Sequence, residues 1–245
     1  STGGKAVLYI SFIDGGDDGT WTVGTDYIKL VADAGSGNGL STPTTFDNSG
    51  NGLVDVIYAG DIKGNLWKFD VSSATPSNWN VAVSGMPLFV AGTQKPIISP
   101  PVVSFHRKGG RLVLFGTGKY LETGDTTTTN TQTVYGIWDN NATASISAGT
   151  LVQQVITDDA DKRTGTINPV PYSATIKGWY INLPVSGERV TGVPTLVDGI
   201  FLFNTIIPTA SPCDFGGRGF VNAIDFLTGG MLAMPAFDTN RNRVL

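Results

Sequence analysis

Cysteine and histidine are almost absent from this sequence, which holds one of each, Cys213 and His106. A single cysteine cannot form a disulfide within the chain, so Cys213 is either a buried thiol or the partner of a cysteine outside this sequence. A cysteine nucleophile is ordinarily activated by a histidine, and the sequence does not place His106 beside Cys213. We therefore expect no hydrolase or transferase activity to depend on either residue.

Charged residues are also scarce, at 15% of the chain, and their sum is −4 at pH 7. This balance gives no electrostatic reason to bind nucleic acid and suits a solvated or cation-binding surface. No apolar run approaches the roughly 20 residues of a membrane-spanning helix. Residues 1–4 do not read as a signal peptide, so we expect the chain to begin inside a mature protein and not to span a membrane.

A sustained apolar stripe of helical period is missing as well, whereas glycine and proline are plentiful, with 32 and 13 residues. Many short strands and turns account for this composition better than helices do. The sequence therefore predicts an all-β protein. We expect strands at Ala6–Phe12, Val54–Ala59, Leu66–Asp70, Arg111–Gly116, Val134–Asp139, Ile200–Asn204 and Phe220–Asp225, and a further strand over Trp21–Val31.

A weak repeat of about 55 residues runs through the chain. In each copy a short segment, usually bearing proline, precedes a turn, an apolar strand and a strand that ends near an aspartate. The three endings are GNLWKFD at Gly64–Asp70, VYGIWD at Val134–Asp139 and GFVNAIDF at Gly219–Phe226. Such repeats are typical of propeller blades, which take roughly 40 to 50 residues each. Tryptophans recur at similar intervals, and we expect Trp21, Trp67, Trp79, Trp138 and Trp179 to pack between sheets.

The segment DNSGNGLVD has the spacing of a cation-binding loop of EF-hand type. Oxygen-bearing groups stand at every second position, namely Asp47, Ser49, Asn51, the backbone carbonyl of Leu53, and Asp55. A hard cation such as Ca²⁺ takes roughly 6 to 8 oxygen ligands, and Gly50 and Gly52 permit the tight coil that directs them inward. The bidentate Glu of a complete EF-hand loop is replaced by Tyr58, so the loop leads into a strand. Asx- and Gly-rich segments also build ordinary turns without metal, and spacing alone leaves both readings open.

Several motifs together resemble the C-terminal domain of type IV pilus tip-associated adhesins, the PilY/PilC family. They are GNGLSTP, the Asp47–Asp55 loop, YAGDIKGNLWKFD, GRLVLFGTGKYLE and TVYGIWD, and the similarity covers Gly3 to about Asp139, with weaker likeness through Gly230. The resemblance implies a modified β-propeller related to the quinoprotein dehydrogenases. At 245 residues the chain would hold a partial propeller of about four blades, as a single domain over residues 1–245 or the C-terminal part of one. It also implies Ca²⁺ at Asp47, Ser49, Asn51, Leu53 and Asp55, with Ser49 standing where the family more often has Asp or Asn.

The resemblance further implies a non-enzymatic function in pilus biogenesis, with control of extension and retraction and attachment to surfaces. The implied partners are pilus-tip pilins or minor pilins and a host-cell or surface receptor, and the implied location is the cell surface. An alternative is a quinoprotein dehydrogenase or its inactive relic, because AGDIKGNLW resembles the docking repeat of those enzymes with one residue fewer. That repeat is structural, and the adjacent cysteine pair of many such enzymes is missing, so we favour the adhesin.

Overall fold

A computed structural model describes residues 4–159, 162–209, 217–234 and 236 of the chain. Within this part the regular structure is β-strand, interrupted by four 3-10 helices: η1 at Pro76–Asn78, η2 at Val83–Gly85, η3 at Thr123–Thr127 and η4 at Ala148–Thr150. The all-β prediction is confirmed. The described residues contain no helix long and apolar enough to cross a membrane. Cys213 lies outside the described residues.

All seven individually predicted strands are present, with ends shifted by at most a few residues. The strands are β1 Ala6–Ser11, β2 Tyr27–Asp33, β3 Thr44–Phe46, β4 Val56–Gly60, β5 Asn65–Asp70, β6 Asn80–Val81, β7 Phe89–Val90, β8 Val102–Phe105, β9 Arg111–Gly116, β10 Thr133–Asp139, β11 Leu151–Asp159, β12 Lys162–Gly165, β13 Gly178–Asn182, β14 Arg189–Val190, β15 Thr195–Val197, β16 Ile200–Ile207 and β17 Arg218–Asp225. They form four sheets, which matches the expected number of blades.

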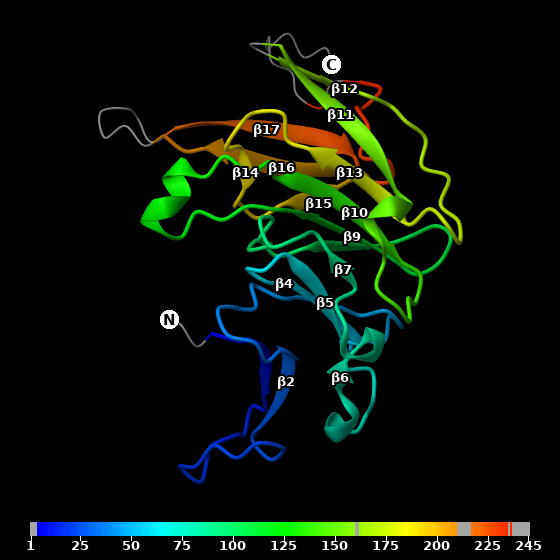
Figure 1. Ribbon diagram of the computed structural model, residues 1–245. Helices are drawn as coiled ribbons and strands as arrows, with labels where there is room; N and C mark the ends of the chain where they lie inside the picture. Colours follow the sequence, from blue (N-terminus) through cyan, green and yellow to red (C-terminus); the bar gives the residue numbers. More distant parts are fainter. Residues whose placement is uncertain (1–3, 160–161, 210–216, 235, 237–245) are drawn as a thin grey trace. The chain divides into compact units, whose positions relative to one another are not determined.

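The chain divides into two compact units, and each is described by itself. The first unit comprises Ser1–Pro101 and Asn141–Ala148, and it contains the two-stranded sheet β1-β2 and a five-stranded sheet built on β3-β4-β5 with β6 and β7. The second comprises Val102–Asn140 and Gly149–Leu245. It contains the six-stranded sheet β12-β11-β13-β10-β9-β8, most of which can be followed in Figure 1, and a four-stranded sheet around β16.

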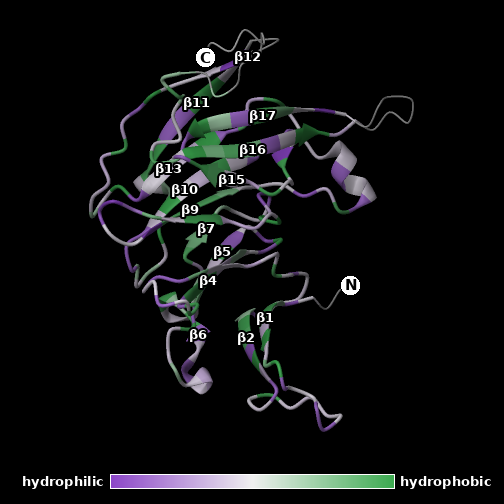
Figure 2. Ribbon diagram, turned by 180° about the vertical axis from the view of Figure 1, so that it is seen from behind, coloured by the Kyte–Doolittle hydropathy of each residue, from purple (hydrophilic) through white to green (hydrophobic). Residues whose placement is uncertain are grey.

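The predicted repeat corresponds to three antiparallel meanders, β3-β4-β5, β8-β9-β10 and β15-β16-β17. Every residue of β4, β9 and β10 is buried, so these strands are apolar on both faces and are packed on both sides. Figure 2 shows the hydrophobic segments concentrated on such strands, with more hydrophilic loops between them. The expectation of one domain over residues 1–245 stays a prediction.

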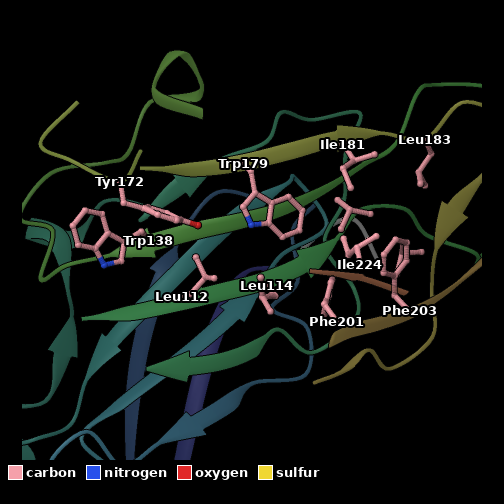
Figure 3. Close-up of a cluster of buried hydrophobic side chains, with 12 residues drawn as sticks. Leu112, Leu114, Trp138, Tyr172, Trp179, Ile181, Leu183, Phe201, Phe203 and Ile224 are labelled. Carbon is pink, nitrogen blue, oxygen red and sulfur yellow. The ribbon is translucent and has the colours of Figure 1, made fainter. Parts of the chain in front are cut away.

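Each unit has its own hydrophobic core between two sheets. In the first unit Leu8, Ile28 and Leu30 of β1 and β2 pack against Ile57, Ala59, Trp67 and Phe69 of β4 and β5. In the second, side chains of the six-stranded sheet pack against Phe201, Phe203 and Ile224 of β16 and β17. Figure 3 shows this second cluster, in which Trp179 projects toward Leu114 and Trp138 lies beside Tyr172. Sheets packed face to face are the arrangement expected of neighbouring blades.

The segment Trp21–Val31 departs from the prediction, because its strand begins only at Tyr27. The buried Asp26 carboxylate accepts the backbone N–H groups of Gly16 and Thr22, at 3.2 and 2.6 Å, and these bonds hold residues 16–26 in a turn. Trp21 therefore lies outside the sheet and is 59% exposed. The prediction that it packs between sheets is wrong, whereas Trp67, Trp138 and Trp179 are buried as expected.

Candidate metal site in the Asp47–Asp55 loop

The candidate loop connects β3 to β4, and its base is fixed by the sheet. The N–H of Asp55 donates to the carbonyl of Phe46 at 3.1 Å, which extends the β3–β4 pairing by one bond. On the other side of the strand, the N–H of Val71 donates to the carbonyl of Asp55 at 3.0 Å. Asp47 thus directly follows one anchored strand and Asp55 directly precedes the next. The sheet holds the two ends of the loop together, with or without a ligand.

The carboxylate of Asp47 lies inside the coil and collects its backbone N–H groups. Its Oδ1 accepts from Gly50 at 2.6 Å and Ser49 at 3.1 Å, and its Oδ2 accepts from Gly52 at 2.7 Å. These bonds, above all the one from Gly52, lower the pKa of Asp47 below its ordinary value of 3.8. The Asp47 carboxylate is therefore charged at neutral pH. Gly50 and Gly52, which donate to it, have φ angles of +73° and +85°, which L side chains rarely adopt.

The carboxylate of Asp55 closes the loop from the opposite end. Its Oδ2 accepts the N–H groups of Asn48 and Ser49, both at 2.8 Å. The N–H of Ser49 is consequently shared between Asp55 and Asp47, which brings the two carboxylates of the loop to a common point. Two like charges held this close to each other attract a cation between them.

The remaining predicted groups also carry oxygen and lie in the same exposed coil. The Ser49 hydroxyl donates to Asp47 Oδ1 at 3.3 Å, and the Asn51 Oδ1 accepts the N–H of Leu53 at 2.8 Å. The side chain of Leu53 is 68% exposed, so its contribution is restricted to the backbone carbonyl. The structure thus brings all five predicted residues into one loop. Their donors are oxygen only, and this set fits a hard cation such as Ca²⁺ better than a soft one.

In the part of the chain that the structure describes, no group of three or more His, Cys, Asp or Glu side chains could hold a metal ion. The Asp47–Asp55 loop has two carboxylates and reaches a higher donor count only through neutral oxygens. Such a donor set corresponds to weak, extracellular-grade calcium sites rather than to high-affinity sensors.

Asp61, in the motif AGDIKGNLW, is a structural residue that supports the same sheet. Its carboxylate is fully buried and accepts the indole N–H of Trp67 at 2.8 Å and the amide of Asn38 at 2.9 Å. It also accepts the backbone N–H groups of Lys63 and Asn65 and the side-chain amide of Asn65, at 2.8–2.9 Å. These bonds position Trp67 in the core, and both oxygens of the Asp61 carboxylate are used as structural hydrogen-bond acceptors. Sequence reasoning missed the partnership with Asn38, which lies 23 residues away in a glycine-rich turn.

His106 is buried in an aromatic environment and has no catalytic surroundings. Its ring lies 4.4 Å from Tyr172 and 4.9 Å from Trp138, measured between centroids. The Nδ1 atom accepts the N–H of Lys108 at 3.2 Å, and no hydrogen-bond partner for the buried Nε2 occurs in the described residues. Burial, together with Arg107 and Lys108, lowers the pKa of His106 below 6.5. The ring therefore acts as a neutral core group beneath the turn at Arg107–Gly110.

The polar loop at Thr123–Thr133 is held from below by Arg189. The guanidinium of this buried arginine donates to the backbone carbonyls of Lys119, Asp125 and Thr128 at 2.8–3.0 Å, and to that of Gly187 at 2.9 Å. Asp125 in turn accepts the N–H groups of Leu121 and Glu122 at 2.8 and 3.0 Å. Hydrogen bonds from Arg189 therefore fix the backbone of this loop from outside it.

A cavity of about 460 Å³ lies in the second unit. It is lined by residues of β11, β12 and β17 and by Gly229, Met231–Met234 and Ala236. Its buried Gln154 donates to the carbonyls of Asn168 and Thr228 and accepts from Asn168 and Thr166. The side-chain amide of Gln154 is thus satisfied within the protein.

Comparison with known proteins gives a consistent result. The family model described as "PilY1 beta-propeller domain" matches residues 1–168, which include the whole candidate loop. Curated relatives include the type IV pilus biogenesis factor PilY1 of Pseudomonas aeruginosa (strain UCBPP-PA14), 30% identical over 272 residues, and a PilY1 homolog of Xylella fastidiosa, 33% identical over 258 residues. These alignments cover 87% and 94% of this chain but only 24% and 17% of the relatives.

A solved structure supports the same relationship. The crystal structure of the Pseudomonas aeruginosa PilY1 C-terminal domain aligns with a TM-score of 0.77 at 30% identity, covering 90% of this chain and 53% of that one. The family model matches more than half of the chain, and the expected fold and the expected family are both confirmed. This chain belongs to the PilY1 β-propeller domain family.

Proposed function

We propose that this chain is a calcium-binding β-propeller module of a type IV pilus biogenesis protein located at the pilus tip on the cell surface. The calcium proposal rests on the backbone N–H of Ser49, which donates to the carboxylates of both Asp47 and Asp55 and so keeps them close together. The pilus part is supported by the relatives, which are named type IV pilus biogenesis factors. The module would contact pilus-tip pilins or minor pilins, control extension and retraction, and attach to a host-cell or other surface receptor.

Ca²⁺ would be held by the side chains of Asp47, Ser49, Asn51 and Asp55 and by the carbonyl of Leu53. The ion supplies positive charge that offsets two neighbouring carboxylates and ties the end of β3 to the start of β4. The backbone N–H groups that the carboxylates now accept already orient them within the coil. Little reordering of the loop is then needed, which favours binding. Mg²⁺ should substitute poorly, because a flexible loop of this kind does not impose its compact octahedral geometry.

Calcium is expected to stabilise the folded chain measurably. At about 2 mM Ca²⁺ and a dissociation constant near 10⁻⁴ M, binding to the folded state alone adds roughly 1.8 kcal/mol to the free energy of unfolding. For a chain of this length the melting temperature rises by roughly 4–7 °C. The measurement is a thermal melt with calcium and with chelator, for the wild type and for Asp47→Ala and Asp55→Ala, which should lose the shift.

Asp18→Ala is the matched control, because Asp18 is an exposed aspartate that accepts a backbone N–H in another turn of the same unit. This variant should keep the full calcium shift. A wild type that melts at the same temperature with and without calcium would show that the loop is only a turn. In the intact protein, loss of either loop aspartate should disturb pilus extension or retraction.

We infer that the chain has no enzymatic activity of its own. The residues of the dehydrogenase-like motif are used for structure, as the bond between Asp61 and the Trp67 indole shows. His106 is enclosed by aromatic rings and does not face solvent. An absorbance scan after addition of a quinone cofactor and calcium tests this inference, since a cofactor spectrum would support the dehydrogenase alternative.

The buried His106 should make stability depend on pH in a narrow window. Because its pKa is lower in the folded state than its ordinary 6.5, the unfolded chain binds the proton more readily. The stabilisation is fully present above pH 6.5 and is lost as the pH falls through the folded-state pKa. Tyr172 beside it stays neutral, because burial raises its pKa. Urea unfolding of the wild type and of His106→Phe, compared between pH 7.5 and the onset of carboxylate titration, should show a smaller pH dependence for the variant.

Asp33 and Asp47 do not contribute to the pH dependence in this window, because the pKa of Asp33 is lowered to about 2 and that of Asp47 is also lowered. Their contributions disappear only at more acid pH. Lys29→Met, which removes an exposed charge, serves as the control and should keep the wild-type slope. Identical slopes for the wild type and His106→Phe would contradict the prediction.

A further inference from the structure

The dipeptide Asn51–Gly52 occupies the centre of the candidate loop and has unusual surroundings. The backbone N–H of Gly52 points at a carboxylate oxygen, Asp47 Oδ2, at 2.7 Å. The side-chain oxygen of Asn51 accepts the N–H of Leu53 at 2.8 Å. Both residues are exposed, and no atom lies within 4 Å of the point where a Cβ on Gly52 would stand. Two polar contacts and free space therefore surround one asparagine–glycine bond.

These three features match the requirements of one reaction, the attack of a backbone nitrogen on the preceding asparagine side chain. The attacking N–H must give up its proton to a base within about 2.6–3.2 Å, and Asp47 Oδ2 is at such a distance. The amide oxygen gains negative charge and is stabilised by a donor at about 2.7–3.1 Å, as the N–H of Leu53 provides. A residue without Cβ must follow, so that the five-membered ring can form without a clash.

We propose that Asn51–Gly52 is a self-modification site, at which the loop itself promotes conversion of Asn51 to aspartate and isoaspartate. The Gly52 nitrogen forms a bond to the Asn51 side-chain carbonyl carbon, and its proton passes to Asp47. The bond from that carbon to the amide nitrogen breaks, and the nitrogen leaves as ammonia with the proton returned. The resulting cyclic imide adds one water molecule at either carbonyl, which opens it to an aspartate or an isoaspartate. The net change replaces NH₂ by OH, with no oxidant or reductant.

The chain contains a second asparagine–glycine pair, Asn38–Gly39, that provides an internal comparison. Asn38 is buried, and its amide nitrogen donates to Asp33 at 2.8 Å and to Asp61 at 2.9 Å, which holds the leaving group in place. The N–H of Gly39 donates to the side-chain oxygen of Asn38 itself at 2.9 Å and not to a base. The same dipeptide is therefore blocked at this position. Any difference between the two sites arises from structure and not from the local sequence.

The modification would change the calcium loop, and this consequence rests on the proposed function. An aspartate at position 51 adds a third carboxylate among the five donors and strengthens calcium binding. An isoaspartate moves the carboxylate along the main chain by one carbon and removes it from the alternating pattern. The loop would hence mature into two populations with different calcium affinities.

The experiment incubates the whole chain at neutral pH in chelator and follows the peptides that contain residues 38 and 51 by mass spectrometry over time. Asn51 should convert, and Asn38 should convert at least about tenfold more slowly. Asp47→Asn removes the base and should slow conversion at Asn51 by about tenfold or more. Asp18→Asn is the matched control, because Asp18 accepts a backbone N–H in another turn of the same unit, and the rate at Asn51 should stay within about twofold of the wild type.

Equal rates at Asn38 and Asn51, an unchanged rate in Asp47→Asn, or equal slowing in both aspartate variants would each overturn the proposal. Asn51→Gln should abolish the signal and so identifies its source. The outcome is independent of calcium binding, because the incubation contains chelator. Asp47→Asn would lose the calcium-dependent melting shift if the loop binds calcium, whereas Asp18→Asn would keep it, and only Asp47→Asn should alter the conversion of Asn51. Failure of one proposal is thus distinguishable from failure of the other.

Discussion

Replacing Asp61 by alanine should lower the free energy of unfolding by about 3–5 kcal/mol, since several buried donors lose their acceptor at about 1–3 kcal/mol each. The indole of Trp67 and the amide of Asn38 are buried and cannot turn to water for a new partner. Asp61→Asn should cost less, because one acceptor oxygen remains. The loss is measured by urea unfolding followed by circular dichroism.

Asp70→Ala is the control for this measurement. Asp70 is the last residue of the hairpin strand β5, but it is exposed, and its carboxylate accepts from the N–H and hydroxyl of Ser72 at 3.0 and 2.6 Å. Its removal should change the free energy of unfolding by roughly 1 kcal/mol or less. If Asp61→Ala proved as mild as Asp70→Ala, the carboxylate would not be the structural centre of the hairpin.

A loss of up to about 3–5 kcal/mol is also expected for Glu188→Gln, which removes the nearer counter-charge of the partly buried Arg163 and leaves Asp158, at 3.6 Å. The side chains of Arg163 and Glu188 form a bidentate pair at 2.7 and 2.8 Å, and Glu188 also accepts the Thr205 hydroxyl at 2.6 Å. The Arg163 guanidinium lies 3.4 Å from the centroid of the Phe220 ring. The pair thereby ties β12 of the six-stranded sheet to β16 and β17 of the four-stranded sheet.

The double variant Arg163→Met/Glu188→Leu distinguishes a broken ion pair from a lost contact. Replacing both charges by apolar groups removes the cost of burying them and should recover most of the stability lost in Glu188→Gln. Denaturant midpoints of Arg163→Met, Glu188→Leu, Glu188→Gln and the double variant give the comparison. A double variant that is less stable than either single variant would show that the pair contributes more than its burial costs.

Much of the fold was predictable from the sequence, because strands buried on both faces give continuous apolar runs. Val56–Gly60 and Arg111–Gly116 are such runs, bounded by glycine-rich turns, and both are strands as expected. The loop residues were also predictable, since Asp47, Ser49, Asn51, Leu53 and Asp55 lie within nine consecutive positions. Local spacing is sufficient where all the contacts are local.

Contacts between distant residues could not be predicted in this way. Glu188 and Arg163 are 25 residues apart, and no local sequence pattern joins them. Trp21 was expected to be buried together with the other tryptophans, yet the turn organised by Asp26 places it outside the sheet. Only tertiary packing decides such cases, because a single residue type fits both a core and a surface.

Arg189 gives the Thr123–Thr133 loop an unusual freedom to diversify. The guanidinium donates hydrogen bonds to main-chain carbonyls, and every amino acid has such a carbonyl. The path of the backbone is consequently specified from outside the loop, by a residue 61–70 positions away. An exposed side chain of the loop, such as that of Thr129, can then be exchanged without changing that path. The backbone of the loop is fixed while its exposed side chains can vary. Substitutions there can therefore change the surface chemistry with little effect on the fold.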